Sequence, residues 1–100
     1  MYKLIYTETA EFDLQSIFDN IAQSSRINAV NYLSKIEQSI LQLRDFPEMA
    51  PFCRYPEIEA LGIRVLSCEN HLVFHTVEKD AKTVTVIRVL RGSMDYEKLF

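Results

Sequence analysis

Glycine is scarce in this 100-residue chain, which contains only Gly62 and Gly92. A phosphate-binding loop needs several closely spaced glycines, so the common glycine-rich nucleotide-binding motifs are excluded. The Gly-x-Ser-x-Gly and His-Glu-x-x-His strings of common hydrolases are also absent. The sequence therefore excludes P-loop nucleotide hydrolases and the common serine and zinc hydrolases.

Long apolar runs are also missing. A run such as 72–74 is far shorter than the roughly 20 residues that a membrane-spanning helix requires. The N-terminal segment turns polar at Thr7 and Glu8, too early for the apolar stretch of a signal peptide. We therefore expect no membrane partner and a cytoplasmic location, in which Cys53 and Cys68 stay reduced.

The composition is that of an ordinary globular protein, with 48% hydrophobic and 25% charged residues. At this length we expect a single domain over residues 1–100. A net charge of −3 argues against a surface that binds nucleic acid, so we expect no direct DNA binding by the chain alone. The charge is uneven, with a balance of −4 over residues 1–60 and +1 over residues 61–100. An anion-binding site is therefore expected in the second part.

The first half of the chain predicts a short strand and two helices. Residues 2–7 are rich in aromatic and β-branched side chains, which indicates a strand. Apolar residues then recur at helical spacing in two stretches. One starts after Thr7 or Thr9 and reaches about residue 23, and the other starts after 24–25 and ends at Phe46. Two helices joined so closely form an antiparallel hairpin.

The second half predicts a connection and three strands. All three prolines lie within residues 47–56, which makes 47–62 an irregular connection that ends at Gly62. Apolar runs and alternating patterns then predict a meander of three strands, at 63–66, 71–77 and 83–90. The predicted fold is α+β, in the order β-α-α-β-β-β, with the helical hairpin on one face of a small, mostly antiparallel sheet. No helix is left for the second face, which we expect to be open.

Acidic residues gather at the start of the first predicted helix. Glu8, Glu11 and Asp13 lie in its first two turns, where the helix dipole favours negative charge. Because the dipole is enough to explain them, we assign these carboxylates no function.

Cys53, Cys68, His71 and His75 are residue types that bind zinc. In one strand, however, His71 and His75 would stand about 13 Å apart, too far to share one ion. We therefore expect no metal site and no other cofactor. We expect His71 at the solvent edge where its strand begins, and His75 to be either a hydrogen-bonded core histidine or a residue of the open face.

Three arginines on the predicted strands are candidates for anion binding. Arg64 and Arg88 lie within strands and Arg91 lies at the end of one, and adjacent strands could bring them together. Guanidinium groups stay charged and bind phosphate or carboxylate with two hydrogen bonds. The alternative is ordinary ion pairing at the sheet edge with nearby acidic residues, namely Glu59, Glu69 or Asp95.

Short motifs follow one another along nearly the whole chain. They are Ala10-x-x-Asp13-Leu14-x-x-Ile17, Ala29-x-x-Tyr32-Leu33-x-x-Ile36, Leu43-x-x-Phe46-Pro47, Leu61-Gly62-Ile63-Arg64, Glu69-Asn70-His71-Leu72-Val73-Phe74 and Val84-x-Val86-Ile87-Arg88-Val89-Leu90-x-Gly92-x-x-Asp95. Each motif alone is weak, but together and in this order they are fairly specific. The chain resembles the RelE/ParE superfamily of type II toxins, and most closely its ParE branch.

The resemblance implies a growth-inhibiting toxin of a plasmid-stabilisation or related system, neutralised by a cognate antitoxin whose C-terminal segment wraps around it. ParE-like members act on DNA gyrase without known catalytic chemistry, so the resemblance favours a binding protein over an enzyme. It implies that the C-terminal strand and tail carry much of the toxicity. With the strand arginines included, the expected target-binding residues are Arg64, Arg88, Arg91, Asp95 and Tyr96.

RelE-like members are instead ribosome-dependent mRNA endonucleases, and this is the alternative function. Cleavage needs proton carriers and cations around the phosphate. Here Arg64, Arg88 and Arg91 would supply cations, His71 or His75 a proton carrier, and Tyr96 an acid or a base-stacking group. The acidic net charge disfavours work on ribosomal RNA. A third possibility is a non-toxic member that retains antitoxin binding.

Overall fold

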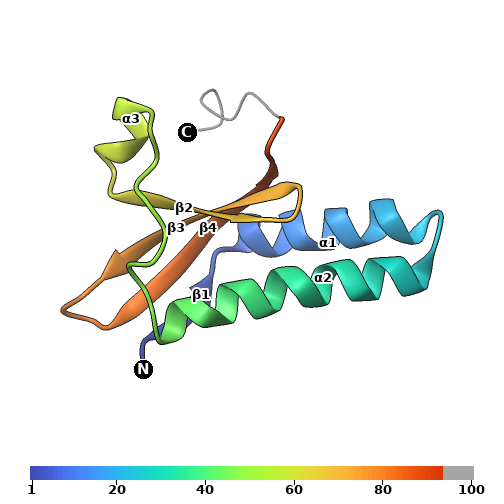
Figure 1. Cartoon of the computed structure of the whole chain (residues 1–100), viewed down its shortest axis with the longest axis horizontal. Coiled ribbons are helices and arrows are strands. Elements are labelled where there is room, and N and C mark those ends of the chain that lie inside the picture. The colour runs from blue at the N-terminus through green and yellow to red at the C-terminus, as the bar shows by residue number, and fades with distance from the viewer. Residues whose placement is uncertain (94–100) are drawn as a thin grey trace.

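The chain folds as a helical hairpin packed against a four-stranded sheet (Figure 1). The structure is a computed structural model and describes residues 1–93. Its elements in chain order are β1 (Lys3–Tyr6), α1 (Glu8–Ala22), α2 (Arg26–Leu41), the 3-10 turn η1 (Gln42–Arg44), α3 (Pro56–Glu59), β2 (Ile63–Cys68), β3 (His71–Glu78) and β4 (Thr83–Arg91). The predicted α+β fold and the predicted order of elements are confirmed, with α3 added.

Side-chain caps set the start of both long helices. The Thr7 hydroxyl accepts the backbone N–H of Ala10 at 3.0 Å, so Thr7 and not Thr9 caps α1. The Ser25 hydroxyl accepts the N–H of Asn28 at 3.2 Å and caps α2. The helical stretch ends before Pro47, first tightening into η1, because the residue preceding a proline disfavours the helical conformation.

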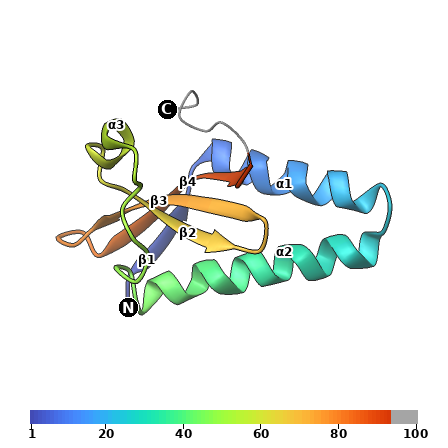
Figure 2. The same cartoon turned by 45° about the horizontal axis from the view of Figure 1, so that its top comes forward.

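The sheet has the strand order β1-β4-β3-β2. The last three strands form the predicted antiparallel meander, whereas β1 pairs in parallel with β4. The helical hairpin lies along one face of this sheet, and its far end projects beyond the β2–β3 turn (Figures 1 and 2). The main core lies between them, with a centre of fully buried side chains contributed by Ile36, Ile40, Leu43, Val73, Val84 and Val86.

The second face of the sheet is only partly open, so the expectation of an uncovered face is wrong for the part around Phe74 and Leu90, whereas Ile5 on β1 is 39% exposed. Residues 51–62, with α3, fold back over it and build a second buried cluster (Figure 2). Cys53 and Ile58 pack there against Phe74 and Leu90 from the sheet. The Cys53 N–H also donates to the Ile63 carbonyl at 2.9 Å. The proline-rich segment covers this part of the face through single apolar side chains, Cys53 and Ile58, that its turns direct toward the sheet.

Both cysteines are buried free thiols, Cys53 in the second cluster and Cys68 in the main core. Within residues 1–93, no helix combines the length and the apolar character needed to cross a membrane.

Candidate functional site

A bulge in β4 decides where Arg88 and its neighbours point. On one side β4 pairs with β1 only as far as Val86, where β1 ends. On the other side, neighbouring β3 residues pair with Arg88 and Val86, which leaves Ile87 as an extra residue. Such a bulge bends the strand and leaves backbone groups without ladder partners.

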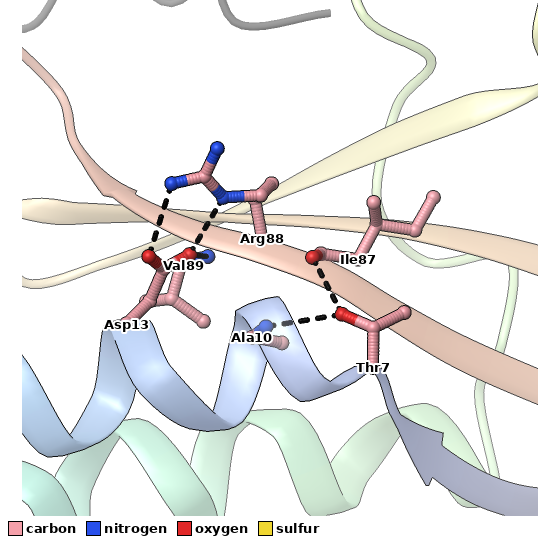
Figure 3. Close-up of polar contacts among 6 residues, drawn as sticks. All are labelled: Thr7, Ala10, Asp13, Ile87, Arg88 and Val89. Carbon is pink, nitrogen blue, oxygen red and sulfur yellow. Dashed lines mark hydrogen bonds and ion pairs between the residues drawn. The ribbon is translucent and has the colours of Figure 1, made fainter.

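The start of α1 takes the place of the missing strand (Figure 3). The Thr7 hydroxyl donates to the Ile87 carbonyl at 2.8 Å, and a carboxylate oxygen of Asp13 accepts the Val89 N–H at 3.0 Å. Two backbone groups at the bulge are satisfied in this way, which ties the first turns of α1 to the end of β4.

Asp13 also holds Arg88. Its two carboxylate oxygens accept Nε and Nη2 of Arg88 at 2.8 and 3.0 Å, a bidentate pair (Figure 3). Asp13 is only 8% exposed. The hydrogen bonding of Arg88 to the Asp13 carboxylate raises the pKa of the guanidinium, burial lowers it, and the carboxylate charge raises it further. The helix dipole alone therefore does not explain Asp13. Its position in the apolar stripe of α1, beside Ala10 and Leu14, indicates a buried carboxylate, and the sequence analysis missed this signal.

Arg64 lies at the opposite edge of the sheet. Its guanidinium donates to the Ala50 carbonyl at 2.7 Å, stands 4.0 Å from the ring centre of Phe52 and pairs with Glu48 at 3.6 Å. These contacts hold residues 48–52 against β2. Arg64 and Arg88 therefore belong to separate internal networks, and the structure does not bring the three arginines together. Within the described residues, the acidic partners are Glu48 and Asp13.

His75 is the core histidine of the two alternatives given above. It is fully buried, and its Nδ1 donates to the Val73 carbonyl at 3.1 Å, while Nε2 has no hydrogen-bond partner among residues 1–93. Burial lowers the pKa of His75, the bond to Val73 offsets this in part, and the charge of Arg64 lowers it again. A neutral, sealed imidazole cannot exchange protons with a substrate.

His71 begins β3 as predicted, but the expected solvent edge is wrong. The side chain is buried, because β3 lies between β2 and β4 and Tyr32 of α2 packs edge-on to the imidazole. The Tyr32 hydroxyl lies 2.6 Å from His71 Nδ1 and accepts the Asn70 N–H at 3.1 Å. Burial, and next the charge of Arg91, lower the pKa of His71.

Arg91 lies directly opposite His71 in the β3–β4 register and is exposed. Across residues 1–93, no hydrogen bond or ion pair engages its guanidinium. Of the three strand arginines, Arg91 is thus the one that no side chain within residues 1–93 engages.

Two pockets flank this end of the sheet, and Asn70, His71 and Arg91 line both. The Arg91 pocket, of about 310 Å³, is completed by residues of α1 and α2, which are Ser16, Ile17, Asn20, Ile21 and Tyr32. The second, of about 360 Å³, is completed by Ser67, Glu69, Leu72, Gly92 and Ser93.

A separate apolar groove of about 470 Å³, here called the helical groove, runs between α1 and α2. Leu14, Phe18, Val30 and Leu33 form its apolar lining, with polar residues at its rim. Val30 is 52% exposed and the nearby Ile27 is 74% exposed. An apolar groove of this kind suits the apolar side of a partner helix.

The remaining predicted site residues, Asp95 and Tyr96, lie outside the described residues. Among residues 1–93, no three histidine, cysteine or acidic side chains come close enough to bind a metal ion.

Comparisons with known proteins identify the family. A model of the family described as the ParE toxin of the type II toxin–antitoxin system parDE matches residues 4–96. The search of curated proteins gave no match. The chromosomal ParDE system from P. aeruginosa contains a chain of similar fold, with a TM-score of 0.73 and 21% identity over 91% of this chain and 96% of that one. The RelBE2 toxin–antitoxin complex from Mycobacterium tuberculosis contains another, with a TM-score of 0.66 and 17% identity over 90% and 96%. Matched over nearly its whole length, the chain belongs to the ParE family of type II toxin–antitoxin toxins.

Proposed function

We propose that this chain is a cytoplasmic toxin that inhibits growth by binding DNA gyrase, and that a cognate antitoxin neutralises it. Its family is that of the ParE toxins, and similar folds occur in toxin–antitoxin complexes. The observation that carries the choice of a binding mechanism is the internal use of Arg64 and Arg88. With these two engaged, Arg91 is the strand arginine left to meet a target.

The helical groove and the exposed sheet edges are the surfaces proposed for the antitoxin. An amphipathic helix docks in a groove through apolar residues at helical spacing, and Leu14, Phe18 and Val30 offer such a surface. The substitution Val30→Glu places a charge in this groove without opening the core, because Val30 is half exposed. It is expected to weaken antitoxin binding about tenfold or more, whereas the control Gln38→Glu on the same helix leaves binding unchanged.

One observation favours the ribonuclease alternative. His71, a proton carrier, and Arg91, an available cation, stand side by side at a pocket. Phosphate cleavage gains most from several cations around the developing charge. Arg64 and Arg88 are held by Ala50 and Asp13, and this leaves the ribonuclease in second place.

Purified components separate the two functions. The free chain is mixed with gyrase, ATP and relaxed plasmid, and in parallel with translating ribosomes and a defined mRNA. The proposal predicts loss of supercoiling, relieved by the antitoxin, with intact mRNA. Ribosome-dependent mRNA cleavage with normal supercoiling would reverse the order of the two functions. No effect in either reaction would favour the non-toxic member that only binds antitoxin.

A further inference from the structure

We propose that the Arg91 pocket is a receptor for one carboxylate group, supplied by an aspartate or glutamate side chain of a protein partner. The proposal rests on the proposed function only in that a partner protein docks at this end of the sheet. The pocket is built by four elements that meet there, namely α1, α2, the start of β3 with the turn before it, and the end of β4.

Tyr32 and Asn70 form the hydrogen bonds around His71 on the pocket wall. The Tyr32 oxygen accepts the Asn70 N–H, and we assign the Tyr32 hydroxyl proton to the 2.6 Å hydrogen bond with His71 Nδ1. A neutral imidazole that accepts at Nδ1 carries its own proton on Nε2. Burial, and next the charge of Arg91, lower the pKa of His71, which favours the neutral ring. His71 therefore presents an N–H donor that no residue within 1–93 engages.

The charge of the lining favours an anion. Arg91 is the one charged residue among the described side chains that line the pocket, and none of them is a carboxylate. Ser16, Asn20 and Asn70 add neutral hydrogen-bond donors. Glu69 lines the second pocket and not this one. In a chain of net charge −3, this is a local concentration of donors around a guanidinium that has no ion-pair partner in the described part of the chain.

The single positive charge of the pocket favours a carboxylate over a chain of phosphates. One guanidinium balances one negative charge and fits a carboxylate with two hydrogen bonds. The neighbouring strand cation, Arg88, is already neutralised by Asp13 and adds nothing. A nucleic acid brings many phosphates and gains its affinity from several cations at once, which the acidic chain does not offer. Ile17 and Ile21 supply an apolar wall for the methylene groups of an acidic side chain.

Acetate is the probe that tests the pocket without gyrase or antitoxin. Histidine ring signals of the free chain are followed by NMR as acetate replaces chloride at constant ionic strength. We expect a saturable shift of the His71 signals and a rise in the His71 pKa, because a bound anion favours the imidazolium. His75, sealed in the core, is the internal control and is expected not to move.

Two charge-matched variants complete the test. Arg91→Gln is expected to weaken acetate binding about tenfold or more, since a hydrogen bond to a charged group is lost. Lys79→Gln removes the same charge from an exposed turn outside the pocket and is expected to bind acetate like the parent. Equal thermal unfolding of the two variants shows that the fold is retained.

Three results would overturn the proposal. They are a shift that rises linearly with acetate without saturating, a response that Arg91→Gln leaves intact, and tighter saturable binding of inorganic phosphate than of acetate. No step of this test uses gyrase. Acetate binding can therefore be absent although the chain inhibits gyrase, and acetate can bind although the chain does not inhibit gyrase.

Discussion

Replacing Asp13 by alanine tests the claim that Arg88 is held for the fold and not for a target. Asp13 accepts three hydrogen bonds, two from the Arg88 guanidinium and one from the Val89 N–H. The substitution leaves a partly buried charge and a buried amide without partners. Breaking a buried pair costs about 3–5 kcal/mol. The Arg88 side chain is 23% exposed and regains some water, so we expect about 3 kcal/mol.

Thermal and urea unfolding followed by circular dichroism measure this loss. For a domain of this size each kcal/mol shifts the midpoint by about 4–8 °C, so Asp13→Ala is expected to melt roughly 12–24 °C below the parent. The control Glu11→Ala, at an exposed position two residues earlier in α1, is expected to cost less than about 1 kcal/mol, because it loses only the dipole interaction.

A double-mutant cycle isolates the pair. Asp13→Ala and Arg88→Met remove the same interaction, so the double variant is expected to lose about 2 kcal/mol less than the sum of the two. Additive losses, or a melting temperature of Asp13→Ala within a few degrees of the parent, would refute the structural role of Arg88.

Three further perturbations follow from the same contacts. Burial lowers the pKa of His75, so below about pH 6.5 the unfolded chain binds more protons than the folded one. The free energy of unfolding therefore falls as the pH falls. Urea unfolding at pH 7.5 and 5.5 should show this loss of stability, and the loss should be smaller in His75→Leu. Arg64→Met removes the bond to the Ala50 carbonyl and is expected to cost about 1–3 kcal/mol, with faster hydrogen exchange at the Cys53 amide that pairs residues 51–53 with β2. Thr7→Val removes both the cap of α1 and the bond to the bulge and is expected to cost about 1–2 kcal/mol in urea unfolding. A stability that does not change with pH would contradict the burial of a neutral His75. Unchanged hydrogen exchange at Cys53 would contradict the role of Arg64, and unchanged stability of Thr7→Val would contradict the role of Thr7.

Local chemistry made most of the fold predictable. The spacing of apolar residues, helical in the first half and alternating in the second, located both helices and the meander. Hydroxyl side chains marked the starts of the two helices to within two residues. The covering of the second face was not predictable from period, because residues 47–62 bury isolated apolar side chains, with Cys53 between two prolines and Ile58 after the last one. Such contacts depend on where the chain returns in space.

The site was less predictable, because its logic is long-range. Asp13 and Arg88 are 75 residues apart, and only the fold brings the end of β4 against the start of α1. Strand positions alone grouped the three arginines as candidates for anion binding, whereas their partners in the structure separate them. The buried place of Asp13 in the apolar stripe of α1 was the one available signal. Tyr32 forms a hydrogen bond with His71, and no local sequence pattern indicates this contact between residues 39 positions apart.

The most direct test of the central claim is pulse labelling of DNA and protein synthesis in bacteria within minutes of inducing this chain without its antitoxin. Binding to gyrase predicts that thymidine incorporation falls first while amino-acid incorporation continues. Arg91→Gln should weaken the effect, and Lys79→Gln should not. Collapse of protein synthesis before DNA synthesis would contradict the account and support the ribonuclease, with His71 and Arg91 as its first candidates.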